Sequence, residues 1–372
     1  MSDTPEPVLR VATFDDFAGV AALLPQVGLG PALPDSWRHL WKENPALQGR
    51  GAELPMGWVL EAETSIVGYM GCIPLLYDYH GRTLLAAAAT TLGVLPAYRN
   101  HSLRLVGAFF DLSAPDILID TTANETAGKV FRLFGALPVP QSDYDRVLFW
   151  VLQPRAFLNA YLRKMKYRRA ASIGGTLLAL PLWCEMGVRQ RKPLKYSRTL
   201  ELTVMSPEQI GAEFDELWAR KTREGKRLIG YRTAEVLHWH FAGPHPWGAV
   251  EFLAGRRKGK LAGYAALSRE PTPELGLVRA RILDVFVEND APEIIDQLLE
   301  HAFQTARGNG SHVLELFGFP EFIRERMEAG HPYNRRLPAW PFFYKVIHRD
   351  LRAELATEEA WYASIFDGDA SF

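Results

Sequence analysis

The sequence predicts an α/β (α+β) protein of two similar lobes in tandem, each a mixed, mostly antiparallel sheet flanked by helices. Three observations lead to this prediction. The chain has 372 residues, which is enough for two domains of ordinary size. The order strand, helix, three strands, helix, strand, helix, strand occurs in both halves. Matching elements of the two halves lie 193 to 195 residues apart, as an internal repeat requires.

Composition narrows the classes of function. Apolar residues make up 48% of the chain and charged residues 23%, which is typical of a folded globular protein. With 42 basic and 43 acidic residues the chain lacks the basic excess of a nucleic-acid binder, so no nucleic-acid partner is expected. Cys72 and Cys184 lack the spacing of a disulfide framework or a metal site, so neither is expected. No apolar run occupies residues 1–10, and a cytoplasmic location is expected.

Each half is expected to begin with a capped helix. Thr13 and Asp16 have the spacing of a capping box, ahead of apolar residues at helical spacing. Ser206 and Gln209 repeat this pattern, with Pro207 at the first helical position. A tryptophan-rich patch closing on proline follows in both halves.

Three strands are expected next in each lobe. Residues 57–62 correspond to 247–252, and residues 67–71 correspond to 262–266. A third β-rich run, 84–95, corresponds to 278–287. The resulting division is an N-terminal lobe with the binding site, a linker, a C-terminal lobe and a tail, at residues 1–152, 153–200, 201–350 and 351–372.

The linker differs in character from both lobes. Between Gln153 and Arg198 it carries eleven basic residues and one acidic residue, Glu185. Its centre, 173–184, is apolar but shorter than the roughly 20 residues that span a bilayer. The pattern favours a peripheral contact of residues 161–198 with the inner membrane surface, in which Trp183 enters the acyl boundary. The alternative is a connector whose apolar centre packs on the lobes.

A strand followed at once by a helix marks a candidate anion site in the first lobe. The run 92–104 passes from the expected strand through Pro96 and Arg99 into a helix. Backbone N–H groups of a helix N-terminus, with arginine beside them, can hold a phosphate or pyrophosphate. The alternative is an ordinary turn with a surface arginine.

Two motifs carry a resemblance to a known family. Val94, Pro96, Tyr98 and Arg99 resemble the acyl-CoA signature of the GNAT N-acyltransferases, and Asn124 begins a stretch similar to that family's second signature, an Asn-x-x-Ala helix that ends in glycine. The whole chain resembles tandem GNAT proteins, including FemAB-like transferases and bacterial GNAT-type ceramide synthases. The resemblance implies two GNAT-like lobes and acyl-CoA as co-substrate, bound in lobe one by Leu92, Gly93, Val94, Arg99, Asn100, His101, Ser102, Leu103, Arg104 and Asn124.

Departures from the family pattern limit the resemblance. Both glycines of the family's phosphate loop are replaced between Arg99 and Arg104, and Phe131 stands where many members carry a tyrosine acid. The second lobe has Glu288 and Asp290 at the corresponding loop, and these acids would repel a pyrophosphate. The donor site is therefore expected in lobe one.

The resemblance implies acyl transfer from CoA to a primary amine, which requires a base. Asp120, at the end of the strand 117–120, is the first candidate, and Asp284, inside an apolar strand, is the second. Either could instead be structural, Asp120 as a cap and Asp284 paired with Arg279 or Arg281. The preferred acceptor is a long-chain, sphingoid-type amine at the membrane. The alternatives are an amino sugar acceptor, a FemAB-like reaction with aminoacyl-tRNA, and a non-catalytic binding protein.

Overall fold

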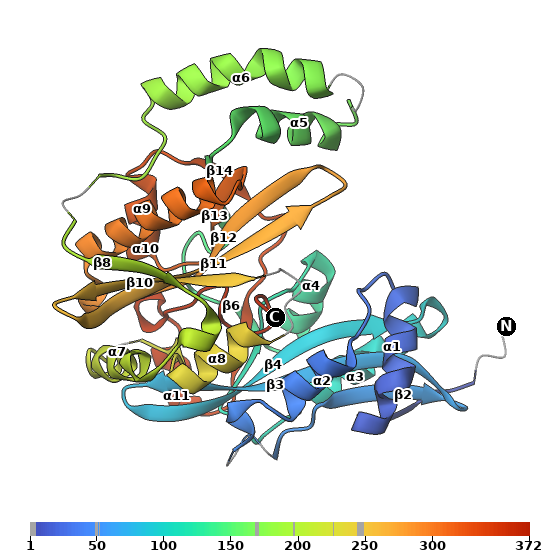
Figure 1. Cartoon of the computed structure of the whole chain (residues 1–372). Coiled ribbons are helices and arrows are strands. Elements are labelled where there is room, and N and C mark those ends of the chain that lie inside the picture. The colour runs from blue at the N-terminus through green and yellow to red at the C-terminus, as the bar shows by residue number, and fades with distance from the viewer. Residues whose placement is uncertain are drawn as a thin grey trace.

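Two sheets, each with helices packed against it, form the body of the protein, and a helical hairpin lies outside the second sheet (Figure 1). The computed structural model describes residues 5–48, 51, 53–167, 171–195, 198–225, 227–243 and 249–372. The arrangement is the predicted α/β class with two lobes of similar element order; each lobe has a second helix ahead of its three central strands, and the second half of the chain also contributes the short strand β9 (Ile229–Gly230).

The sheet of lobe one is antiparallel except where β4 pairs with β5. Its spatial order is β1-β2-β3-β4-β5-β15-β6, with β9 attached to β3. The strands are β1 (Val8–Val11), β2 (Gly57–Ala62), β3 (Ser65–Tyr79), β4 (Arg82–Val94), β5 (Ile117–Asp120), β15 (Phe343–Val346), β6 (Leu137–Pro138) and β9 (Ile229–Gly230).

The sheet of lobe two repeats this pattern, and β12 with β13 is its parallel pair. The spatial order is β14-β7-β13-β12-β11-β10-β8. The predicted first residues of β10, 247 and 248, lie outside the described residues. The strands are β14 (Tyr333–Arg336), β7 (Arg146–Val151), β13 (Val313–Leu316), β12 (Leu277–Val287), β11 (Lys260–Thr272), β10 (Val250–Arg257) and β8 (Glu201–Met205).

Both predicted capping boxes are present. The backbone N–H of Thr13 donates to Asp16 at 2.8 Å, and that of Ser206 donates to Gln209 at 2.9 Å. A short 3-10 turn follows each box before the α-helix starts. The helices of the lobes are α1 (Phe17–Gln26), α2 (Pro34–Trp41), α3 (Ser102–Phe110), α4 (Glu125–Leu133), α7 (Ala212–Arg223), α8 (Ala234–Ala242), α9 (Pro292–Gly308), α10 (Glu321–Glu328) and α11 (Arg349–Glu354).

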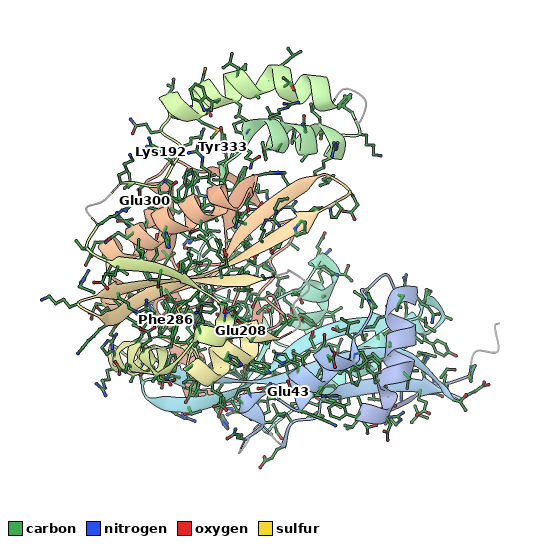
Figure 2. The ribbon with its side chains drawn as sticks, viewed as in Figure 1. Glu43, Lys192, Glu208, Phe286, Glu300 and Tyr333 are labelled. Carbon is green, nitrogen blue, oxygen red and sulfur yellow. The ribbon has the colours of Figure 1, made fainter. Side chains whose placement is uncertain are left out.

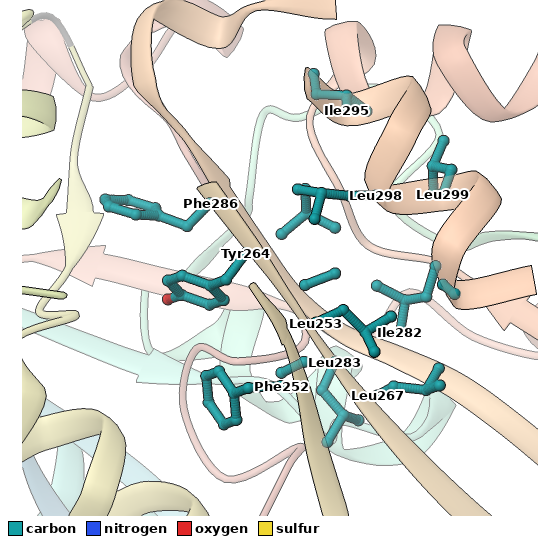
Figure 3. Packing of buried hydrophobic residues seen from close by; sticks show 14 of the residues in the cluster. Phe252, Leu253, Tyr264, Leu267, Ile282, Leu283, Phe286, Ile295, Leu298 and Leu299 are labelled. Carbon is teal, nitrogen blue, oxygen red and sulfur yellow. The ribbon is translucent and has the colours of Figure 1, made fainter. Parts of the chain in front are cut away.

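Apolar side chains cover both faces of each sheet. In lobe one, alternate residues of β4 face opposite ways, so Ala86 and Ala88 join the core under α1 and α2, while Ala87 and Ala89 join the core under α3 and α4. In lobe two, the rings of Phe252, Tyr264 and Phe286 lie on one side of the strands and the leucines of α9 on the other (Figure 3). The strands that lead to the site are therefore held on both faces.

The two lobes exchange strands. β7 lies in the sheet of lobe two, and β15 lies in the sheet of lobe one. The sheets therefore do not divide the chain at the expected positions 152 and 350. Residues 358–372, named here the C-terminal segment, form no free tail, since 360–368 are all buried. In Figure 1 the C-terminus lies between the two sheets near α4.

The linker forms a helical hairpin, α5 (Pro154–Lys164) and α6 (Ala171–Val188), in which α6 is outermost (Figure 1). Gly174 and Gly175 allow α6 to approach α5 closely, next to Leu162 and Asn159. The hairpin rests on lobe two where Tyr333 lies beneath α6 (Figure 2). There the Arg191 guanidinium stacks 3.9 Å from the Tyr333 ring and pairs with Glu185 at 2.7 Å.

The outer face of α6 is apolar and exposed. Leu177 is 70% exposed, Leu180 66% and Trp183 64%. No charged residue occurs between Thr176 and Cys184, and exposed lysines lie on both sides of α6 along the chain: Lys164 and Lys166 before it, Lys192 and Lys195 after it. Arg168 and Arg169 of the predicted basic flank lie outside the described residues.

Candidate functional site

A cavity opens where β4 and β5 separate. Their pairing ends at Ala88 and Ile119, and the register of β4 against β3 shifts beside Thr91, whose φ is +49°. A bulge of this kind bends a strand and leaves backbone groups outside the ladder. The cavity beyond it has a volume of about 770 Å³ and is lined by both strand ends, the α1–α2 loop, the start of α4 and the C-terminal segment.

The residues expected near the reacting groups lie at or beside this cavity. Leu92 and Asn124 line it together with Asp120. The Asn124 side chain caps α4 by accepting from the N–H of Ala127 at 2.9 Å. Gly93 packs under the α1–α2 loop, since a Cβ there would lie 2.9 Å from Val27. Val94 is partly buried in the core on the α3 side of the sheet.

The expected phosphate loop lies at the end of β4 and outside the cavity. Residues Pro96–His101 form a 3-10 helix that leads into α3, in place of an open glycine loop. Arg99, Asn100 and Leu103 are exposed, and the Ser102 hydroxyl donates to the Arg99 carbonyl at 2.8 Å. His101 lies 3.2 Å from the Asn100 amide. Arg104 donates to the carbonyl of Pro7 at 2.8 Å.

Asp120 shares the cavity with a second carboxylate, Asp369. Asp120 is 9% exposed and accepts from the backbone N–H of Thr122 at 3.2 Å. Asp369 accepts from the hydroxyls of Thr121 and Thr122 at 3.0 and 3.1 Å. Burial raises the pKa of Asp120 well above its usual range, and the charge of Asp369 raises it further. Burial also raises the pKa of Asp369.

A tyrosine hydroxyl lies in the same wall. Tyr69 is 1% exposed, and its ring stacks on Trp37 with centroids 5.7 Å apart. Its hydroxyl has no hydrogen-bond partner among the described residues. Burial raises the pKa of this phenol, so it stays neutral and can donate. Phe131, in the place of the family's tyrosine, also lines the cavity.

Asp284 lies in lobe two and is fully buried. Arg232 binds it with two hydrogen bonds of 2.9 and 3.0 Å, and the Tyr264 hydroxyl donates to it at 2.8 Å. The partner is thus Arg232 rather than Arg279 or Arg281. β12 and β13 also separate, beyond Arg281, but here the hydroxyl of Tyr362 from the C-terminal segment donates to the Val285 carbonyl at 2.6 Å.

Asp120, Leu92 and Asn124 were predicted from the sequence as site residues, and all three line the cavity. Asp369 and Tyr69 also line it and were not predicted. Asp369 lies 248 residues from Thr121, so no local pattern connects them. Tyr69 lies in a strand where an aromatic residue is ordinary core. No group of three metal-ligating side chains occurs among the described residues. No helix in the described part of the chain combines the length and apolarity needed to cross a bilayer.

Comparisons with known proteins rest on structure alone. No family model matches the chain, and no curated protein matches it in sequence. A GCN5-related N-acetyltransferase from Anabaena variabilis matches with TM-score 0.56 and 11% identity, over 92% of this chain and 73% of that one. A probable N-acyltransferase from Enterococcus faecalis matches with TM-score 0.59 and 8% identity, over 92% and 73%. Saccharomyces cerevisiae N-myristoyltransferase with bound myristoyl-CoA matches with TM-score 0.54 and 12% identity, over 92% and 80%.

At such identities the likeness concerns the fold. Because each match covers 92% of this chain, it extends over both lobes. The chain therefore has the fold of the GCN5-related N-acetyltransferases.

Proposed function

We propose that the protein is an acyl-CoA-dependent N-acyltransferase whose reaction takes place in the cavity of lobe one. The observation that supports this most directly is the separation of β4 and β5 over a cavity with a buried carboxylate, Asp120. Solved structures with this fold include N-acetyltransferases and an N-myristoyltransferase with bound myristoyl-CoA. The corresponding opening of lobe two contains Tyr362, which favours lobe one as the donor site.

In the proposed reaction the neutral amine attacks the thioester carbonyl carbon of acyl-CoA. The new C–N bond forms, the C–S bond breaks, the proton of the amine goes to Asp120, and CoA leaves as the thiolate. Positioning supplies much of the acceleration, and a backbone N–H of the irregular strand end 91–94 would stabilise the oxyanion. The raised pKa of Asp120 suits a base, since it strengthens the affinity of the carboxylate for the proton.

The pyrophosphate of CoA would lie against the start of α3. Helix N-termini present unpaired backbone N–H groups to anions, and the exposed Arg99 adds a charge. Arg104, held by Pro7, would contribute less to this site. Asn100, His101, Ser102 and Leu103 complete the proposed loop contact.

The proposed acceptor is a long-chain amine at the inner membrane surface. The support is the outer face of α6, where an exposed apolar stretch including Trp183 lies between lysines that precede and follow the helix along the chain. This distribution is typical of a helix that lies in a membrane interface. An amino sugar acceptor fits the same cavity chemistry and differs by needing no membrane contact.

A thiol-release assay tests the proposal. The purified full chain would be mixed with acetyl-, octanoyl- and palmitoyl-CoA, with octylamine, sphinganine or glucosamine as acceptor. The proposal expects amine-dependent CoA release and an N-acyl product by mass spectrometry. Absence of both, with no CoA binding by calorimetry, would contradict it. Preference for glucosamine would select the sugar acceptor.

A further inference from the structure

The C-terminal segment brings Asp369 into the cavity of lobe one. The backbone N–H of Asp369 donates to the Thr121 hydroxyl at 3.1 Å, and its carboxylate accepts from Thr121 and Thr122. Gly368 has φ +68°, and a Cβ at this position would lie 2.3 Å from the Thr121 hydroxyl oxygen. The turn is thus shaped so that its backbone touches the end of β5 and its acid faces the cavity.

Lobe two fixes the other end of the same segment. Ser364 lies against the buried Arg232 and Asp284 pair, with its hydroxyl 3.3 Å from Arg232. The Ser364 N–H donates to Asp367 at 2.8 Å, which closes the turn before Gly368. Tyr362 anchors the segment to β12. The C-terminal segment occupies the place where β12 and β13 separate in lobe two. Its contacts there help to set the position of Asp369 in the cavity of lobe one.

The cavity presents two acids, Asp120 and Asp369, and its described wall holds no lysine or arginine. The Tyr69 hydroxyl, 1% exposed and without a partner among the described residues, adds a polar group on the neighbouring strand. The Thr90 side chain, on β4 between β3 and β5, is a further hydrogen-bond partner of Asp369. Buried acids of this kind are expected to have a cationic partner.

The remaining wall is apolar. Leu24 and the α1–α2 loop contribute aliphatic side chains, and Trp37 and Phe372 contribute rings. This surface can bury a carbon skeleton, and its described residues offer no lysine, arginine or further acidic side chain to a second ionic group. The acidic wall and the apolar wall are together complementary to a ligand that has one cationic end and an apolar body.

We propose that Asp369 and Asp120 together bind the ammonium group of the acceptor, and that the apolar wall from α1 to Trp37 takes its carbon skeleton. The acceptor class is then a primary amine on an apolar body without a second charge. This inference rests on the proposed function and deepens it, because it assigns the amine side of the same cavity. Asp369 binds the substrate, whereas Asp284 and Arg232 act through the segment as positioning residues.

The two carboxylates, Asp120 and Asp369, can also accept a proton from the ammonium group of the acceptor. A primary ammonium placed between the two carboxylates lets both ionise, and loss of one proton from nitrogen to the pair leaves the amine neutral for attack. The titratable groups that face this position are Asp120, Asp369, Tyr69 and His39. Both acids are already biased toward holding a proton, since burial raises each pKa.

Calorimetric titration of the full chain with octylamine and with octan-1-ol separates charge from apolar contact. Asp369→Asn keeps the shape and removes the charge, so octylamine affinity should fall tenfold or more at pH 8 while octanol affinity stays within twofold. Asp350→Asn, at an exposed carboxylate on α11, is the matched control and should change neither. Equal octylamine affinity in wild type and Asp369→Asn would overturn the inference, as would wild type that does not bind octylamine.

A second variant and a pH series guard against a purely structural effect. Gly368→Ala keeps the charge of Asp369 but displaces its carboxylate. The affinity for octylamine should therefore fall in this variant as it does in Asp369→Asn. Octylamine affinity of wild type should rise with pH as the pair ionises. In Asp369→Asn the rise should move to lower pH, because Asp120 loses its negative neighbour; an unmoved profile contradicts the pair. CoA titration of wild type reports separately on the proposed function, which fails if CoA does not bind.

Discussion

At the scale of single residues, the proposed site combines an exposed arginine and a buried acid. Arg99 is exposed at the start of the α3 region, whereas Asp120 is buried in the cavity. These two environments suit the two halves of the proposed reaction, since a phosphate contact needs an accessible charge and a base needs a raised pKa.

Arg99→Ala should weaken CoA binding. Loss of a charge-assisted hydrogen bond to phosphate costs about 1.5–3 kcal/mol, so Kd should rise by roughly 10- to 150-fold. Isothermal calorimetry on both proteins measures this directly. Lys260→Ala, on β11 of lobe two, serves as a charge control and should leave Kd unchanged. Equal affinity of wild type and Arg99→Ala would remove the loop from the donor site.

Asp120→Asn should lower turnover by about two orders of magnitude while the fold stays intact, because the amide cannot accept the proton. In wild type the acid is active only when ionised, and its pKa is raised, so kcat should climb with pH through that raised pKa and then level off. The variant should lose this climb. A stopped assay across pH 5–9 checks both points, and near-normal turnover would exclude Asp120 as base.

Asp284→Asn should lower the free energy of unfolding of the protein. Arg232 and Asp284 are both fully buried, and removing one charge leaves the other unpaired at a cost of about 3–5 kcal/mol. Denaturant unfolding measures the loss. If Asp284 served lobe one only by anchoring the C-terminal segment, CoA affinity should be retained at temperatures where the variant is folded. Unchanged stability with lost turnover would instead support a direct catalytic role.

At the scale of elements, the α5–α6 hairpin is built differently from the helices of the lobes. The latter bury one face against a sheet, whereas α6 buries one face on α5 and exposes leucines and Trp183 on the other. Large exposed apolar stretches mark interaction surfaces. The proposed lipid acceptor depends on this hairpin surface, whereas a sugar acceptor would not need it.

Co-sedimentation with vesicles tests this surface. Each basic residue near an anionic membrane contributes on the order of 1 kcal/mol, and the leucines and Trp183 add an apolar contribution. Binding should require anionic lipid, weaken at high salt, and fall in Trp183→Ala and in Lys164→Gln/Lys166→Gln. Trp218→Ala, in lobe two, controls for loss of a tryptophan. Wild type that stays in the supernatant with every vesicle would favour the sugar acceptor.

At the scale of the whole molecule, the lobes are joined by exchange. β7 completes the sheet of lobe two, β15 completes that of lobe one, and the C-terminal segment is buried between them. Contacts of this kind couple the stability of one lobe to that of the other, because neither sheet is complete without residues from the other half.

The two lobes should therefore unfold together. Scanning calorimetry at neutral pH should show one transition whose calorimetric enthalpy equals the van't Hoff enthalpy. A fragment of residues 1–152 should fail to show cooperative unfolding, since it lacks β15 and carries β7 without a partner. Two well-separated transitions of the full chain would contradict this coupling.

The sequence by itself determined the fold class and the repeat of elements in the two lobes. Capping boxes at Thr13 and Ser206, strand periodicity and the helix after Asn124 depend on residues within one or two turns of each other, so local pattern predicts them. Asp120 was predicted because the family resemblance implies a base and this acid ends the strand 117–120; in the structure it lines the cavity.

Only the tertiary structure decided the strand exchange, the pairing of Asp284 with Arg232, and the arrival of Asp369 beside Asp120. Each of these joins residues far apart in the chain whose own neighbours carry no signal of the contact. Packing selects such partners by the burial of charge and apolar surface over the whole molecule, a balance that no short window of sequence contains.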